Sequence, residues 1–140
     1  MAGYLLMANQ FETLGIVVSS TNRPDHSKTP DQGEWARGYF GESYAKDLPQ
    51  LNRELGGYPD QISFMESSIK LTVERYDPNR NYESLEYYPT VLSLLHATMQ
   101  TDKMIHVLCW GSLTEPALLV NHLVSIGRTD LLKKLWFIAH

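Results

Sequence analysis

The stretch from Met104 to Leu119, MIHVLCWGSLTEPALL, constrains the fold of this chain more than any other. It begins with a nearly continuous apolar run: Ile105, Val107, Leu108, Cys109 and Trp110. A run of this kind that ends in a glycine turn is typical of a strand buried on both faces of a parallel sheet. After the turn a helical pattern opens at Pro116, with Ser112 or Thr114 as the expected N-cap. The stretch predicts half of a βαβ unit, whose turn lies where such sheets bind ligands.

The composition is that of one globular domain. The chain has 140 residues, of which 43% are hydrophobic and 20% charged, and its formal net charge is −4. This balance provides no basic surface, so a nucleic acid or an anionic membrane is disfavoured as a partner. No apolar run approaches the roughly 20 residues of a membrane span. The single cysteine, Cys109, excludes an internal disulfide and is expected to be a small buried hydrophobic residue.

Apolar periodicity predicts the remaining elements. Helices are expected over residues 1–11, 42–55, 86–100 and 117–126, with a short helical turn at 129–134. Strands are expected over residues 14–18, 105–110 and 135–139, and short strands or loop anchors over 62–65 and 69–73. Ser, Thr, Asn, Pro and Asp accumulate at 19–31 and 75–83, which predicts loops there.

Two of the predicted helices have apolar faces that should point into a core. In helix 42–55 the face consists of Tyr44, Leu48, Leu51 and Leu55, and in helix 86–100 it consists of Val91, Leu92, Leu95 and Met99. Pro49 is expected to kink or divide the first helix, and Gly56-Gly57 should end it. Pro89 is tolerable only in the first turn of the second helix.

Together these elements predict an α/β fold, a partial Rossmann-like three-layer sandwich with a mainly parallel sheet in a single domain over residues 1–140. A crossover helix normally follows a strand, whereas here a helix precedes the first strand and a strand ends the chain. We therefore expect the domain to lack its first strand and its C-terminal half. Exposed sheet edges would then invite pairing with another copy of the chain.

Four stretches resemble the nucleoside hydrolase superfamily of the inosine-uridine-preferring type, and most of all its branch in cellulose-binding proteins. Residues 5–22, LLMANQFETLGIVVSSTN, resemble the first helix and second strand of the family. Residues 104–120, MIHVLCWGSLTEPALLV, resemble its "TGPLTNLALAL" stretch, and residues 131–140, LLKKLWFIAH, resemble the strand that follows. Residues 42–60, ESYAKDLPQLNRELGGYPD, resemble a segment of the cellulose-binding branch.

The resemblance implies hydrolysis of the N-glycosidic bond of a ribonucleoside, with a calcium ion that binds the ribose hydroxyls and positions a water molecule. Asn22 matches the loop asparagine of the family that contacts ribose. Trp110 matches a threonine whose backbone carbonyl binds calcium. The aspartate cluster of the family and its late Asp and His have no counterparts in the 140 residues. Ser112 and Glu115 replace the proline and asparagine of the family turn, which puts nucleoside specificity in doubt.

These observations leave three hypotheses open. The chain is a piece of a calcium-dependent nucleoside-hydrolase-like enzyme that is inactive alone, a carbohydrate-binding module, or a structural domain that pairs with another chain. The carbohydrate hypothesis rests on an aromatic segment that could equally be a lid or core: Trp35, Tyr39, Phe40, Tyr44 and Tyr58. Glu115 suits the positive end of a helix as well as an acid–base role. The remaining candidates are expected to be structural or solvated: Asp25, His26, His106, His122 and His140.

Overall fold

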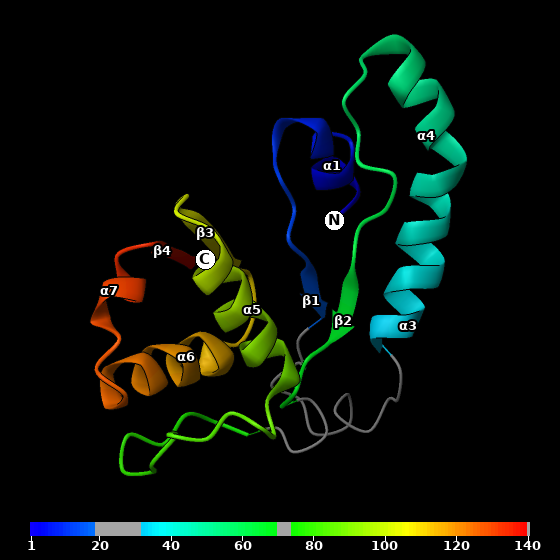
Figure 1. Cartoon of the computed structure of the whole chain (residues 1–140). Coiled ribbons are helices and arrows are strands. Elements are labelled where there is room, and N and C mark those ends of the chain that lie inside the picture. The colour runs from blue at the N-terminus through cyan, green and yellow to red at the C-terminus, as the bar shows by residue number, and fades with distance from the viewer. Residues whose placement is uncertain (19–31, 70–73, 140) are drawn as a thin grey trace. The chain divides into compact units, whose positions relative to one another are not determined.

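The structure is a computed structural model that describes residues 1–18, 32–69 and 74–139 (Figure 1). Backbone contacts divide the described residues into two compact units, one of residues 1–18 and 32–66 and one of residues 67–69 and 74–139. Each unit combines helices with a two-stranded parallel sheet, so the chain has mixed α/β structure. The predicted loop at 19–31, and most of the predicted strand at 69–73, lie outside the described residues.

The first unit is built on a short parallel sheet. Strand β1 (Ile16–Val18) pairs with β2 (Phe64–Glu66) in the register Ile16 to Phe64. The helix predicted over residues 1–11 is divided into α1 (Ala2–Leu5) and the 3₁₀-helix η1 (Ala8–Gln10). The prediction of a single helix was therefore wrong, and of its apolar residues Leu5 and Ala8 are buried, whereas Met7 and Phe11 are exposed.

A long helical segment packs against β2. It consists of α3 (Gln32–Ala36), the π-helical turn η2 (Arg37–Gly41) and α4 (Glu42–Glu54), and helical dihedral angles continue through both junctions. Pro49 lies inside α4 without dividing it. Gly56 and Gly57 end the segment with φ values of +72° and +78°, which glycine adopts without steric cost. The end of the helix predicted over residues 42–55 was thus correct, but the helical segment begins ten residues earlier than predicted, at Gln32.

The core of the first unit lies between this helical segment, α1 and the sheet. Its buried residues are Leu5, Ala8, Ala36, Tyr44, Tyr58 and Phe64. Leu48 and Leu51 pack against this cluster as predicted, whereas Leu55 is 70% exposed. The prediction failed for Leu55 because the glycine turn begins there and directs the chain away from the helical path.

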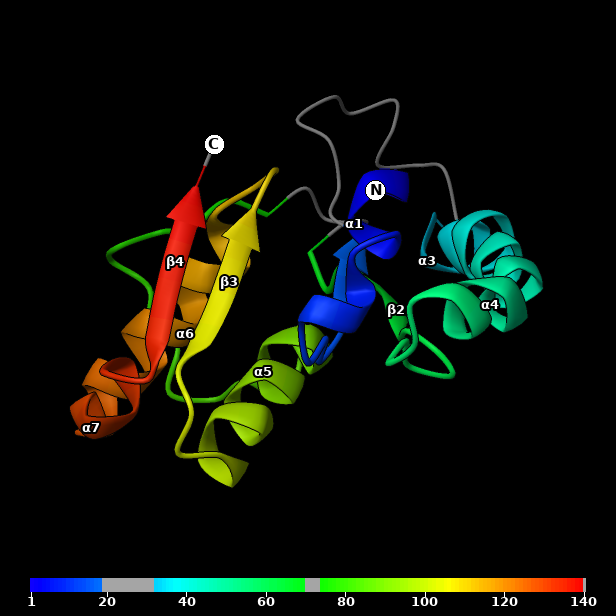
Figure 2. The ribbon, with the colours of Figure 1, turned by 90° about the horizontal axis from the view of Figure 1, so that it is seen from above.

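The second unit contains the predicted strand–turn–helix. After α5 (Pro89–Gln100), the chain forms β3 (Ile105–Cys109), α6 (Thr114–Ser125), α7 (Thr129–Leu132) and β4 (Leu135–Ala139). Strands β3 and β4 are parallel, with Ile105 opposite Leu135, and α6 forms the crossover between them. Figure 2 shows α6 behind the face of this sheet. Pro89 begins α5, as its missing N–H requires.

The core of the second unit covers one face of its sheet. The buried cluster consists of Ile69, Tyr82, Leu85, Tyr88, Val91, Leu95, Leu118, Leu119, Leu123 and Leu131. On β3, Ile105 and Cys109 are buried, but His106 and Leu108 between them are exposed. The prediction that β3 is buried on both faces is therefore wrong in this structure. Met99 is 54% exposed, and the neighbouring Thr98 is buried in its place because its hydroxyl donates to the Leu94 carbonyl (2.7 Å).

In the part of the chain that the structure describes, no helix has the length and apolar character needed to cross a membrane.

Candidate functional site

The turn after β3 is held by hydroxyl groups. Leu113 occupies the N-cap position of α6, and its carbonyl accepts the first helical hydrogen bond from the Ala117 amide (3.0 Å). The predicted N-caps, Ser112 and Thr114, instead form a local turn, in which the Ser112 hydroxyl accepts from the Thr114 amide (3.2 Å). Pro116 fits in the first turn of α6 because the first four amides of a helix have no partner within it. The helix thus begins two residues earlier than its apolar pattern indicated.

Trp110 is the first residue beyond β3, and its side chain is 63% exposed. Its position at the carboxyl end of a parallel strand is the one predicted for a residue that presents a backbone carbonyl to a ligand. Asn22, Asp25, His26 and His140 lie outside the described residues. The structure therefore gives no distance between Trp110 and Asn22.

Glu115 accepts hydrogen bonds from three groups of the same unit. One carboxylate oxygen accepts from the Ser67 hydroxyl (3.0 Å), and the other accepts from the Ser68 amide (2.9 Å) and the Thr90 hydroxyl. The carboxylate also lies in the first turn of α6, where the helix dipole favours a negative charge. These contacts join the segment after β2 to the first turns of α5 and α6. Of the two roles considered for Glu115, the structure supports the structural one.

A calcium site requires six to eight oxygen ligands, mostly carboxylates and carbonyls. Within residues 1–18, 32–69 and 74–139, no three His, Cys, Asp or Glu side chains come together as a metal site would need. The nearest carboxylate to Trp110 in sequence, that of Glu115, is already occupied by hydroxyl and amide donors. In a calcium site the Trp110 carbonyl would be one ligand among many.

The other candidate side chains have structural partners. His122 is buried in α6 and its Nδ1–H donates to the Tyr82 carbonyl (3.1 Å). His106 is exposed and stacks on Trp136 with ring centroids 5.8 Å apart. Cys109 is 7% exposed, and desolvation by burial raises the pKa of its thiol. A thiol that is protonated and inaccessible does not act as a nucleophile, so Cys109 serves as a buried hydrophobic residue.

The aromatic segment separates into buried and exposed members. Tyr44 and Tyr58 belong to the core, and their hydroxyls donate to the carbonyls of Pro59 (2.6 Å) and Leu6 (2.7 Å). Trp35 and Tyr39 are 57% and 63% exposed, and their rings stack with centroids 5.6 Å apart and planes within 11° of each other. Phe40 meets both rings edge-on. Trp35 and Tyr39 are thus the two exposed aromatic residues of the segment, whereas Phe40 is half-buried and packs against the core.

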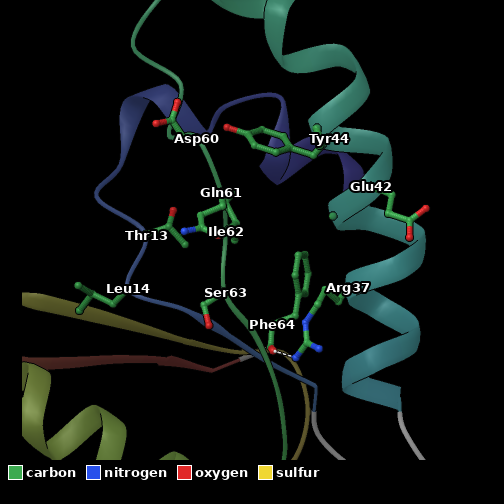
Figure 3. A pocket seen from close by; sticks show the side chains of 12 residues that line it. Thr13, Leu14, Arg37, Glu42, Tyr44, Asp60, Gln61, Ile62, Ser63 and Phe64 are labelled. Carbon is green, nitrogen blue, oxygen red and sulfur yellow. Dashed lines mark hydrogen bonds between the residues drawn. The ribbon is translucent and has the colours of Figure 1, made fainter.

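A shallow groove of about 550 Å³ lies in the first unit, between the helical segment and the chain that leads into β2 (Figure 3). Its apolar lining consists of Leu14, Gly41, Ala45, Ile62 and Phe64. Its polar lining consists of Thr13, Arg37, Glu42, Tyr44, Asp60, Gln61 and Ser63. Arg37 and Asp60 lie toward opposite ends of the groove, and the Arg37 guanidinium donates to the Phe64 carbonyl (3.2 Å). The groove therefore carries side chains of both signs of charge beside its apolar lining.

The groove was not predicted from the sequence. Arg37 and Gly41 reach it from the π-helical turn η2, and sequence periodicity gives no sign of a π-helix. The exposed Trp35 and Tyr39 stand on the same helical segment. Their enrichment in the sequence was the available signal, but exposure could be assigned only once the core was known.

Comparison with known proteins gave no further identification: no protein-family model matches the chain, and neither a curated protein nor a solved structure matches it.

Proposed function

We propose that this chain is a segment of a nucleoside-hydrolase-like protein, in which the turn between β3 and α6 forms part of the edge that binds the sugar of a ribonucleoside. The observation that carries the proposal is the parallel β3–α6–β4 unit, because its turn lies at the carboxyl end of β3, where open α/β sheets bind ligands. The sequence resemblance of residues 104–120 supports it. A Rossmann-like sandwich is part of this proposal.

In this role the chain binds and does not catalyse. The turn offers backbone carbonyl and amide groups of residues 110–113, which suit the hydroxyl groups of ribose as hydrogen-bond partners. Among the described residues no three His, Cys, Asp or Glu side chains come together, and the Glu115 carboxylate at this turn already accepts three hydrogen bonds. Hydrolysis of the N-glycosidic bond would therefore depend on carboxylates other than those of the described residues.

Nuclear magnetic resonance on the 140-residue chain tests this proposal. Inosine or ribose, added at millimolar concentration with and without calcium, should shift the backbone amide signals of Gly111, Ser112 and Leu113. Millimolar affinity corresponds to about 4 kcal/mol, which is appropriate for a partial site. If these signals stay in place while others move, or if none moves, the turn is not the sugar-binding edge. Calcium-dependent release of hypoxanthine would contradict the statement that the chain is not catalytic.

The exposed Trp35–Tyr39 stack favours a second function, the binding of a carbohydrate. Sugar rings present a face of C–H groups, and exposed aromatic rings offer a flat apolar surface to which such a face can bind. Both rings belong to the helical segment whose η2 turn also lines the polar groove, so stacking and hydrogen-bonding groups occur in one unit. Cellulose and xylan are the ligands to test first because of the resemblance of residues 42–60.

A pull-down on insoluble cellulose and xylan, with Trp35→Ala and Tyr39→Ala, tests this second function. Each substitution removes an aromatic ring whose stacking on a sugar contributes about 1 kcal/mol or more to the free energy of binding. It should therefore reduce retention by about fivefold to tenfold. Tyr87→Ala is the matched control, since Tyr87 is 74% exposed and lies in the other unit. Retention that is absent in the native chain, or equal in all three variants, would rule out carbohydrate binding at this stack.

A further inference from the structure

Among the described residues of the second unit, strand β4 pairs along one edge only. The Ile105 amide donates to the Lys134 carbonyl (2.7 Å), which fixes the pattern of hydrogen bonds between β3 and β4. Because backbone groups alternate in direction along a strand, Trp136 and Ile138 direct theirs toward β3. Leu135, Phe137 and Ala139 direct theirs to the opposite edge. Among the described strands, β4 pairs with β3 alone.

This edge lacks the features by which proteins usually prevent edge-to-edge association. Natural edge strands carry charged side chains, proline or a β-bulge. Residues 135–139, LWFIA, have no charge, no proline and no glycine, and their pairing with β3 continues in register without a bulge. Trp136 and Ile138, which share the uncovered face of the sheet, are 57% and 44% exposed.

We propose that β4 pairs antiparallel with β4 of a second copy of this chain, about a two-fold axis that passes between the two Phe137 residues. The backbone groups of Leu135, Phe137 and Ala139 then meet their equivalents, with Phe137 opposite Phe137 and Leu135 opposite Ala139. These are the hydrogen-bonded pairs of an antiparallel ladder. The two sheets join into one of four strands, and the uncovered faces of the two copies lie on the same side.

The side chains are self-complementary in this register. Trp136 of each copy lies opposite Ile138 of the other, so this pair occurs once on each side of the axis. Both pairs are in non-hydrogen-bonded positions, where side chains approach most closely. An aromatic residue opposite a β-branched residue is a favourable cross-strand pair. A two-fold axis at the edge of β3 would instead place His106 opposite Leu108, a polar ring against an aliphatic chain. The edge of β4 is therefore the better match for a second copy.

The small size of the contact predicts weak association. Five residues of one strand bury far less than the roughly 800 Å² per partner of a stable interface, which places this pairing in the weak, transient class. We expect a dissociation constant on the order of 100 μM. The dimer should therefore form at high protein concentration and dissociate on dilution.

Sedimentation equilibrium of the full 140-residue chain, from about 5 to about 500 μM, tests the proposal. The average mass should rise from the monomer value of 16.0 kDa toward twice that value. Ile138→Lys should weaken association at least tenfold, because it removes the β-branched partner of Trp136 and places a charged side chain on an edge strand, which disfavours edge-to-edge pairing. Val124→Lys is the matched control, since Val124 is 56% exposed on α6, and it should leave association unchanged. A constant monomer mass, or equal effects of the two lysines, would overturn the proposal.

Cross-linking tests the register independently of the lysine variants. In a Cys109→Ala background, Phe137→Cys should form a disulfide-linked dimer on mild oxidation, because Cα atoms of an antiparallel hydrogen-bonded pair are about 5.5 Å apart. Leu135→Cys should not, because its partner across the axis is Ala139. Circular dichroism establishes that each variant is folded. Cross-linking of Leu135→Cys in preference to Phe137→Cys would refute the two-fold axis at Phe137, whatever the masses show.

Discussion

The contact between Gly33 and Glu66 predicts that replacing Gly33 with alanine destabilises the first unit. Alanine normally stabilises a helix relative to glycine by about 1 kcal/mol. Gly33 lies in α3, where its amide donates to the Glu66 carboxylate at the end of β2. A Cβ atom at this position would lie 2.7 Å from the Glu66 amide nitrogen and 3.1 Å from its Cα. Real side chains essentially never approach backbone atoms this closely.

The magnitude follows from what must move. Glu66 is the last residue of β2 and pairs with Val18, so its backbone cannot retreat without disturbing the sheet. Overpacking of a well-packed site costs typically 1–3 kcal/mol, and the distances at Gly33 favour the upper end of that range. After the gain of about 1 kcal/mol in helix propensity, Gly33→Ala should lower the free energy of unfolding by about 2 kcal/mol.

Gly38 provides the matched control. It lies in the same helical segment, and a Cβ atom built there meets no atom within 4 Å. Gly38→Ala should therefore leave stability unchanged or raise it by up to about 1 kcal/mol. Urea unfolding followed by circular dichroism measures both variants. The reasoning is wrong if Gly33→Ala is as stable as Gly38→Ala.

Two further predictions concern the second unit. Burial, with a hydrogen bond to Glu74, raises the pKa of Tyr88 from 10.0 to about 12, so stability from the neutral phenol is present below about pH 10 and lost as pH rises toward 12. Urea unfolding at pH 8 and 11 should show a loss of about 1–2 kcal/mol in the native chain that is reduced in Tyr88→Phe. Glu115→Ala should lower the free energy of unfolding by about 2–4 kcal/mol, because it leaves three hydrogen-bond donors without their acceptor. Glu86 lies at an exposed position, so Glu86→Ala should change the free energy of unfolding by less than about 0.5 kcal/mol. Equal effects of these two alanines would contradict the structural role of Glu115.

The elements of the second unit were predictable because their signals are local. Strand β3 and helix α6 were predictable from the local residue pattern: an apolar run at residues 105–109, a glycine turn, and a helical apolar period after it. The same is true of β4 and of the end of α4 at Gly56. The bounds of α6 were less accurate, because Leu113 rather than a serine or threonine occupies its N-cap.

Features that depend on contacts between distant residues were not predictable. Leu55 and Met99 match the apolar period of their helices but lie exposed, since a helix face is buried only where another element covers it. The role of Glu115 requires Ser67, Ser68 and Thr90 to be near it, and no spacing in the sequence expresses that proximity. The π-helical turn at residues 37–41 adds a register change that a period of 3.6 residues cannot anticipate.

The candidate surfaces lie on different units, so the proposals can fail separately. The Trp35–Tyr39 stack belongs to the first unit, whereas the turn after β3 and the edge of β4 belong to the second. Trp35→Ala should therefore reduce carbohydrate retention without moving the amide signals of residues 111–113. Within the second unit, the turn proposed to bind sugar lies at the carboxyl end of β3, and the proposed dimer contact lies along the edge of β4. A nucleoside that shifts the turn signals equally in Ile138→Lys and in the native chain would show that sugar binding does not require the dimer.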